Sequence, residues 1–246
     1  MTKKGTFLTV SVIAVMLSIG CSDVIGMAIL PSDSDNVRVD DGELGTDLSE
    51  RVFIKVPITF DGGGWISGAD NDLGVQGAWH YFAGVDSRID GSFVMENAVT
   101  ASGVVVPPPD GTSYGTYFGA KIGFHICASG SPTNETSEYF TAGSCTLTDG
   151  LVDKLAGISF RLEGTLPTTE LRLQLHEEDR DDGTYEVVKG VGDHFILFEN
   201  ARIHYLEDAE PFHPDLLQAI YFYISSTGGP SSFAFIISDV AFLVNL

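Results

Sequence analysis

The stretch Glu170-Leu171-Arg172-Leu173-Gln174-Leu175-His176 alternates leucine with polar residues. Successive side chains of a β-strand point to opposite faces, so the three leucines share one face and the polar residues share the other. This pattern predicts a strand with one face in a core and one face turned outward. Short hydrophobic segments between glycine, proline and acidic turns lie on both sides of it, so we expect more strands of this kind.

Further strands are expected where β-branched and aromatic residues cluster between the turns. They cover 52–56, 78–82, 102–106, 118–127, 157–162, 194–198, 202–206, 220–225 and 233–237. Only 215–219, behind Pro214, has a helical pattern, and it is one turn long. Many short strands with almost no helix predict an all-β domain over residues 51–246, a jelly-roll β-sandwich of two antiparallel sheets.

The first 21 residues resemble a bacterial lipoprotein signal peptide. Lys3 and Lys4 precede an apolar run over 7–19, which is too short for a stable membrane span. The run leads through small residues to Cys21, although the apolar residue Leu17 stands one position earlier than is usual. The resemblance implies removal of residues 1–20 and attachment of lipid, such as palmitate, to Cys21. The alternative is an ordinary secretory signal.

A lipid on Cys21 implies an anchor in the bacterial cell envelope, which we expect to be the outer membrane, with the protein facing the periplasm or the exterior. Residues 21–50 are rich in Asp, Ser and Gly and have no sustained period. Like charges along such a segment repel one another and keep it extended. We therefore expect a flexible acidic linker with little ordered structure before Arg51.

The charge of the chain limits its partners. It holds 34 acidic and 13 basic residues, for a formal net charge of −21. Nucleic acid and anionic lipid surfaces require clusters of Lys and Arg, so neither is an expected partner. Such an acidic surface suits neutral glycans and divalent cations.

Two cysteines remain once Cys21 is assigned to lipidation. Cys127 and Cys145 form an even pair in an oxidising compartment, which favours a disulfide bond. Closing a loop of roughly 18 residues would stabilise the fold by about 3 kcal/mol in the chain-entropy model. The alternatives are two free thiols or a pair of metal ligands.

Several segments together resemble the carbohydrate-binding-module-like jelly rolls of the galactose-binding-domain-like type. They are Gly74–Trp79, Tyr117–Phe124, Leu155–Phe160, Leu171–His176, the turn at Phe212–Leu217, Ile220–Ile224 and Phe235–Phe242. The resemblance implies a non-catalytic module that binds polysaccharide on one sheet or at its loop tips. Such modules often hold a structural calcium ion.

Flat aromatic rings stack on sugars, while nearby amides, carboxylates and guanidinium groups pair with sugar hydroxyls. Five aromatic residues are the candidates for ligand binding: Trp65, Trp79, Tyr81, Tyr114 and Tyr117. Trp79 also suits a core position, because it lies within a predicted strand. On another strand Tyr221 and Tyr223 share a face, and their polar companions would be Arg172, Gln174 and His176.

Calcium requires oxygen ligands that converge from loops. The candidates are Asp61, Asp70, Asp72 and Asp239, because the loop after the first strand and the final strand often meet in this architecture. The alternative is a set of solvated acidic turns.

Glu177, Asp179 and Asp182 read Glu-x-Asp-x-x-Asp, which is similar to the catalytic motif of laminarinase-like glycoside hydrolases with one substitution. The shorter Asp182 lies in a predicted turn, so an acidic loop is expected and an enzyme is not. Polysaccharide binding is the expected function. The alternatives are a protein-binding module of the envelope and, after it, a glycoside hydrolase.

Overall fold

The chain divides into two units, Met1–Pro31 and Ser32–Leu246, and the computed structural model describes residues of the second. The described residues are 36–38, 51–69, 72–94, 98–110, 118–129, 138–139, 152–177, 184–201 and 212–245. None of the helices within these ranges has the length and apolar character needed to cross a membrane.

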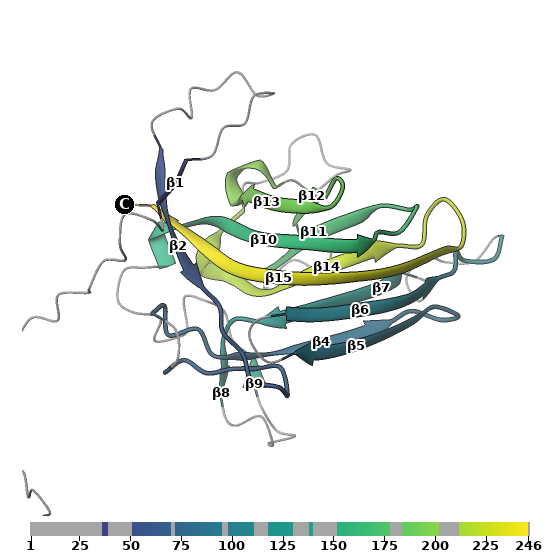
Figure 1. Ribbon diagram of the computed structural model, residues 1–246, viewed down its shortest axis with the longest axis horizontal. Coiled ribbons are helices and arrows are strands. Elements are labelled where there is room, and N and C mark those ends of the chain that lie inside the picture. Colours follow the sequence, from purple (N-terminus) through teal and green to yellow (C-terminus); the bar gives the residue numbers. More distant parts are fainter. Residues whose placement is uncertain are drawn as a thin grey trace, which may run out of the picture. The chain divides into compact units, whose positions relative to one another are not determined.

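Two antiparallel sheets make up the domain (Figure 1). One sheet has seven strands: β1 (Asn36–Arg38), β2 (Val52–Pro57), β15 (Ser231–Asn245), β10 (Leu155–Thr165) and β13 (Gly192–Leu197) in that order, with β6 (Ala98–Val105) paired to β15, and β5 (Arg88–Val94) paired to β6. The other has six, in the order β12 (Thr184–Val187), β11 (Leu171–Glu177), β14 (Leu217–Ser225), β7 (Gly119–His125), β4 (Gly77–Ala83) and β3 (Trp65–Ile66).

Smaller elements lie between these strands along the chain. A two-stranded pairing joins β8 (Ala128–Ser129) to β9 (Glu138–Tyr139). Three short 3-10 turns are η4 (Val152–Lys154), η5 (Phe198–Asn200) and η6 (Pro214–Leu216). The all-β sandwich of two antiparallel sheets predicted from sequence is therefore confirmed.

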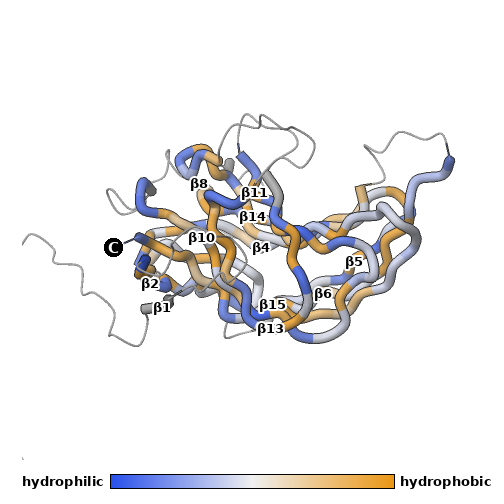
Figure 2. Tube along the Cα trace, turned by 90° about the horizontal axis from the view of Figure 1, so that it is seen from above, coloured by the Kyte–Doolittle hydropathy of each residue, from blue (hydrophilic) through white to orange (hydrophobic). Residues whose placement is uncertain are grey.

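The inward faces of the two sheets share one hydrophobic core. Along the strands, hydrophobic residues are interrupted by hydrophilic ones, as alternating burial requires (Figure 2). Trp79 of β4 lies 4.8 Å from the Phe124 ring of β7, and Phe160 of β10 meets Phe222 of β14 edge-on at 4.8 Å. The last contact joins one sheet to the other, so these rings form the centre of the core.

Strand β15 is the central strand of the seven-stranded sheet. Its first half pairs with β6, its second half pairs with β2, and β10 lies along its other side. The change of partner coincides with an irregularity opposite Ser159 and Arg161, where Asp239 adopts a positive φ of 52°. A bulge of this kind adds a residue to one strand and increases its twist.

Residues Asn36–Arg38 of the expected linker form β1 against β2, and its other residues lie outside the described part of the chain. One expectation from the sequence requires correction. The expected helical turn at 215–219 is a 3-10 turn over Pro214–Leu216, after which Leu217 begins β14. The expected strand at 202–206 lies outside the described residues.

Candidate functional site

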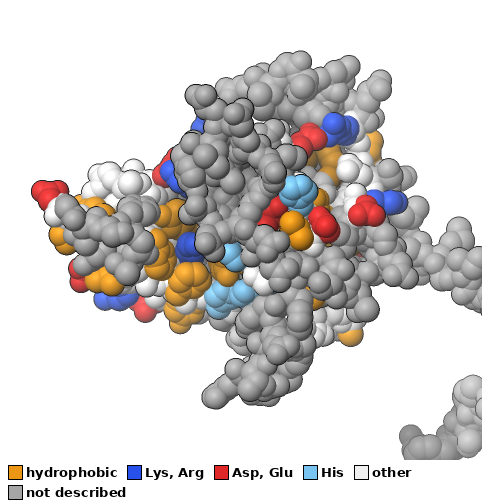
Figure 3. All heavy atoms as spheres, turned by 180° about the vertical axis from the view of Figure 1, so that it is seen from behind, with side chains coloured by type: hydrophobic (Ala, Val, Ile, Leu, Met, Phe, Trp, Pro, Cys, Tyr) orange, Lys and Arg blue, Asp and Glu red, His pale blue; other side chains and the backbone are white. Residues whose placement is uncertain are grey.

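The outward face of the six-stranded sheet is rich in aromatic and histidine side chains. Because inward and outward residues alternate, each central strand contributes every second residue to this face. Histidine and hydrophobic side chains lie next to each other on the side of the molecule opposite to Figure 1 (Figure 3). We call the following set the ring cluster: His80 and Phe82 of β4, Phe118 before β7, Lys121 and His125 of β7, His176 of β11, and Tyr221 and Tyr223 of β14.

Tyr221 lies at the centre of the ring cluster. Its ring centroid is 5.3 Å from that of His80, 5.7 Å from Phe82 and 6.2 Å from His125, and each of these rings meets it edge-on. Aromatic rings favour this geometry, because the positive edge of one ring faces the negative face of another. His176 approaches from β11 at 6.3 Å. Three strands, β4, β7 and β11, therefore place their rings around the one tyrosine of β14.

Gly123 explains how the ring of Tyr221 can lie so close to its neighbours. Gly123 pairs with Tyr221 on one side and with His80 on the other. A Cβ atom at this position would lie 2.0 Å from the carbonyl oxygen of Ile220 and 2.7 Å from Cδ1 of Tyr221. The missing side chain between Lys121 and His125 thus makes room for the tyrosine ring.

Hydrogen bonding fixes the orientation of His80. Its Nδ1 lies 3.3 Å from the carbonyl oxygen of Ala78, and its Nε2 lies 3.2 Å from the hydroxyl of Tyr221. A carbonyl oxygen can only accept, so Nδ1 carries the proton in the neutral ring and the hydroxyl donates to Nε2.

Lys121 extends into the middle of the aromatic rings. Its Nζ lies 5.3 Å from the ring centroid of Tyr223, 5.5 Å from Tyr221, 5.7 Å from Phe118 and 5.8 Å from Phe82. Each distance is within the range of a cation–π interaction. Burial nevertheless lowers the pKa of Lys121 to about 8, because the ammonium group loses water.

His80 and His125 of the ring cluster are neutral near pH 7. Burial lowers the pKa of His80. For His125, burial and then the charge of His80 lower the pKa to about 3. The two imidazoles stack with their centroids 4.6 Å apart, so two charges there would repel each other strongly.

Exposure identifies the part of the ring cluster that a ligand can reach. The Phe82 side chain is 39% exposed, whereas Tyr221 is 7% exposed and is surrounded by its ring neighbours. Phe82 therefore offers an apolar ring surface beside a hydroxyl, two imidazoles and one ammonium group. This combination of stacking surface and hydrogen-bonding groups is chemically suited to sugar rings.

Trp65, a candidate from the sequence, belongs to the same outward face. It lies on the edge strand β3 and pairs with Ala78, which precedes His80 on that face by two residues. Together with Thr59, Phe60, Asp61 and Ser67 it lines a cavity of about 330 Å³. The half-buried Trp65 thus extends the aromatic surface to the edge of the sheet.

The other aromatic candidates lie elsewhere. Trp79 is 3% exposed and belongs to the core, in contact with Phe60 and Phe124, so its ring is not available at the surface. Tyr81 points to the inward side of β4, where it covers Gly91, although it is 41% exposed. Tyr114 and Tyr117 lie outside the described residues.

The residues expected to share a face with Tyr221 do so, whereas the other members of the ring cluster were not predicted from the sequence. Tyr221, Tyr223, Arg172, Gln174 and His176 do lie on the outward side of β14 and β11. His80, Phe82, Lys121, His125 and Phe118 had no assigned role. Their signal was the spacing Lys121-x-Gly123-x-His125, in which polar residues flank a glycine on one face of a strand.

The acidic candidates for calcium do not come together within the described part of the chain. Asp61 accepts hydrogen bonds from the backbone N–H groups of Gly63 and Trp65 at 2.8 and 2.9 Å, which stabilises the turn between them. Asp239 is in the bulge of β15, and Asp72 is exposed. No group of three metal-ligating residues occurs among the described residues, and Asp70 lies outside them. Calcium binding stays a prediction.

Glu177 has a structural position. It is 0% exposed, and its Oε1 accepts a hydrogen bond of 3.0 Å from the backbone N–H of His213. This contact joins the end of β11 to the segment before β14. Asp179 and Asp182 lie outside the described residues, as does Cys145. The disulfide between Cys145 and the buried Cys127 therefore remains a prediction.

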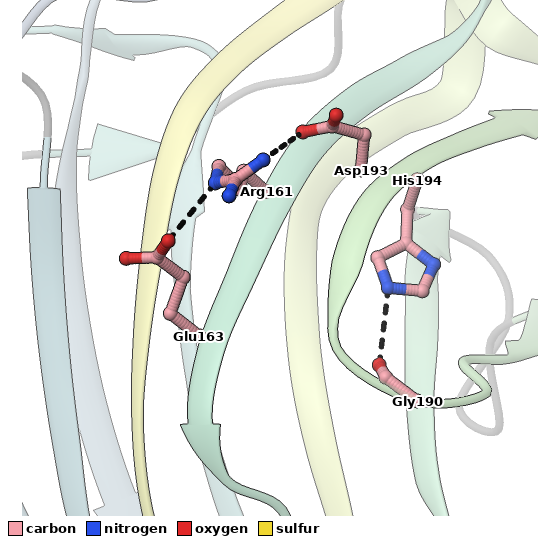
Figure 4. A network of polar contacts seen from close by, with 5 residues as sticks. All are labelled: Arg161, Glu163, Gly190, Asp193 and His194. Atoms are coloured by element: carbon pink, nitrogen blue, oxygen red, sulfur yellow. Dashed lines mark hydrogen bonds and ion pairs between the residues drawn. The ribbon is translucent and has the colours of Figure 1, made fainter.

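The outward face of the seven-stranded sheet has a different character. Arg161 of β10 donates to Asp193 of β13 at 3.0 Å and to Glu163 of its own strand at 3.1 Å (Figure 4). His194, next along β13, is on the inward side of the strand, where its ring stacks on Phe160 at 5.1 Å and its Nε2 lies 3.1 Å from the carbonyl oxygen of Gly190 (Figure 4). The charged groups of Arg161, Asp193 and Glu163 on this face are thus paired with one another.

Comparison with known proteins gives structural neighbours only. No family model matches the chain, and no curated protein does. Among solved structures, the chain is similar to the family 11 carbohydrate-binding module of the cellulosomal cellulase Lic26A-Cel5E of Clostridium thermocellum, with a TM-score of 0.43, 14% sequence identity, and coverage of 68% of this chain and 88% of that one. It is also similar to a family 11 module from Clostridium thermocellum in complex with a β-1,3-1,4-mixed-linked tetrasaccharide, with a TM-score of 0.40, 16% identity, and coverage of 67% and 87%.

Proposed function

We propose that this domain is a non-catalytic carbohydrate-binding module that holds polysaccharide against the ring cluster. The observation that carries the proposal is the exposed ring of Phe82 beside Tyr221 and His80 on one sheet face. A sugar stacks its C–H face on such a ring and exchanges hydrogen bonds with the neighbouring hydroxyl and imidazole. A flat sheet face of this kind suits an extended chain of sugars rather than a single small molecule.

The experiment is a pull-down of the full chain with a panel of insoluble and soluble polysaccharides. Phe82→Ala is expected to weaken retention at least about tenfold, since stacking rings are typical hot spots of a binding face. Ile236→Ala is the matched control, because Ile236 is 38% exposed on the outward face of the other sheet. Equal retention of both variants would place the binding site away from the ring cluster.

Two further variants locate the edge of the site. Trp65→Ala tests whether the ligand reaches strand β3, and Tyr221→Phe removes one hydroxyl while keeping the ring. Both are expected to weaken binding less than Phe82→Ala. Release of reducing sugar from a retained polysaccharide would contradict the non-catalytic assignment. If no polysaccharide is retained, a protein partner in the envelope becomes the better hypothesis.

We also propose that lipid on Cys21 anchors the domain to the bacterial outer membrane. The charged start, apolar run and small residues that precede Cys21 support this proposal. Labelling with a fatty-acid analogue in a Gram-negative host should mark the wild-type chain and leave Cys21→Ser unmarked. Release of the wild-type chain in soluble form would indicate an ordinary secretory signal.

A further inference from the structure

The charges on the ring-cluster face differ from those of the whole chain. At the outward positions of β4, β7, β14 and β11 there is no Asp or Glu, although the chain has 34 acidic residues. The fixed positive charges at those positions are Lys121 and Arg172. Arg172 pairs with Glu170, which precedes β11. No carboxylate of the described residues pairs with Lys121.

The surroundings of Lys121 make this lack of a counter-charge costly. Its ammonium group is partly removed from water by the rings of Phe82, Phe118, Tyr221 and Tyr223. A partly buried charge without a partner is destabilising, because the lost hydration is not replaced. Methionine or leucine would fill the same space without that cost. An external anion that pairs with the ammonium group would explain why a lysine stands at this position.

We infer that the ring cluster selects acidic polysaccharides, and that the carboxylate of a uronic acid unit pairs with Lys121 while its sugar ring stacks on Phe82. This inference rests on the proposed function and specifies its substrate class. His80 and His125, whose rings contact Tyr221 in the same cluster, are neutral at pH 7 and would donate or accept hydrogen bonds with the same sugar. Neither adds a negative charge that would repel a carboxylate.

The net charge of −21 does not prevent such a complex. At physiological ionic strength, exposed charges farther apart than about 8 Å are largely screened from each other. A carboxylate at the ring cluster would therefore respond mainly to Lys121 and the groups beside it. A charge-assisted hydrogen bond in a partly desolvated site is stronger than a neutral one.

The test compares the full chain on acidic and neutral polymers, namely polygalacturonate and alginate against a neutral β-glucan and xylan. The wild-type chain is expected to bind the acidic polymers more tightly. Lys121→Met should weaken binding of the acidic polymers about tenfold to a hundredfold, a larger loss than the same variant shows for the neutral polymers. Lys121→Arg should keep a large part of the acidic binding. The matched control is Lys55→Met on the other sheet face, where Lys55 lies over the ring of Phe195.

A pH series adds a second measurement. Acidic-polymer binding by the wild-type chain should fall as pH rises through about 8, because burial holds the pKa of Lys121 there and only the protonated form attracts a carboxylate. Lys121→Met should show no such fall. Equal wild-type affinity for neutral and acidic polymers, unchanged in Lys121→Met, would overturn the acidic selectivity and leave sugar binding in place. Retention of no polymer at all would overturn the proposed function itself.

Discussion

The two outward faces of the sandwich share the same strand geometry but differ in the side chains that they present. On the seven-stranded sheet, Arg161 is held by Asp193 and Glu163, and the outward residues of β15 between Ser231 and Ile237 are small or aliphatic. On the six-stranded sheet, the rings of two phenylalanines and two tyrosines surround Lys121, which no carboxylate of the described residues pairs with. The charged groups of the first face pair with one another, whereas the lysine of the second face has no such partner among the described residues. We therefore propose the second face as the functional one.

The largest expected difference between the two sheets is in how the free energy of unfolding depends on pH in the acidic range. Unfolded His125 takes up a proton below pH 6.5, whereas folded His125 does so only near pH 3, because burial and His80 lower its pKa. The unfolded state therefore binds more protons in this range, and the free energy of unfolding falls as pH decreases. We expect His125 to account for roughly 2–4 kcal/mol of that loss.

Denaturant unfolding at several pH values measures this effect. His125→Gln should flatten the pH dependence between 6.5 and 3. His194→Gln on the seven-stranded sheet should flatten it less, because burial lowers the pKa of His194 while its bond to Gly190 and the charge of Asp193 raise it. Identical curves for the two variants would show that the histidines of the two sheets do not differ.

Alanine substitutions at two glycines, one on each sheet, distinguish an effect on stability from an effect on binding. Gly123 and Gly157 both lie on outward positions, where an added Cβ would be 2.0 and 2.3 Å from a carbonyl oxygen of the neighbouring strand. Alanine at either position should lower the free energy of unfolding by about 1–3 kcal/mol. Only Gly123→Ala should also weaken polysaccharide binding by the folded protein, since it displaces Tyr221. Binding unaffected by Gly123→Ala would argue against the ring cluster as the site.

The two lysines that lie over aromatic rings are expected to respond in opposite directions. Lys121→Met should raise the free energy of unfolding at pH 7 by about 1–2 kcal/mol, because it removes a partly buried, unpaired charge. The gain should disappear between pH 8 and 10.5, where the folded lysine has lost its proton and the unfolded one keeps it. Lys55→Met removes one cation–π contact of 4.6 Å and should lower the free energy of unfolding slightly. Thermal unfolding across this pH range distinguishes desolvation from cation–π attraction as the stronger effect at Lys121.

The smallest effect is expected from the charged network of Figure 4. Arg161 is exposed and its pKa is raised by hydrogen bonds to Asp193 and Glu163. Exposed ion pairs contribute little in water, so Arg161→Ala should shift the melting temperature by less than about 2 °C and leave polysaccharide binding unchanged. A larger shift would mean that this face contributes to the stability of the sandwich through its charges.

The sequence allowed the fold class to be predicted, because alternation in segments such as Leu171–His176 reports directly on strands with one buried face. It did not show which face of β4 is buried. Trp79 and Tyr81 form one aromatic row and His80 and Phe82 form the other, so hydrophobicity does not distinguish them. The packing of Trp79 against Phe124 decides the orientation, and that contact joins residues far apart in the chain. The ring cluster was only partly foreseen for the same reason.

The position of β15 in the chain has a consequence for biosynthesis. The seven-stranded sheet has this strand at its centre, yet residues 231–245 leave the ribosome after β2, β6 and β10, all of which must pair with it. Val56 pairs with Phe242, which is synthesised only after almost the whole domain has been translated. Such long-range pairing slows folding, and the unpaired strands stay exposed meanwhile. The nascent domain therefore cannot complete its seven-stranded sheet until its last strand is made.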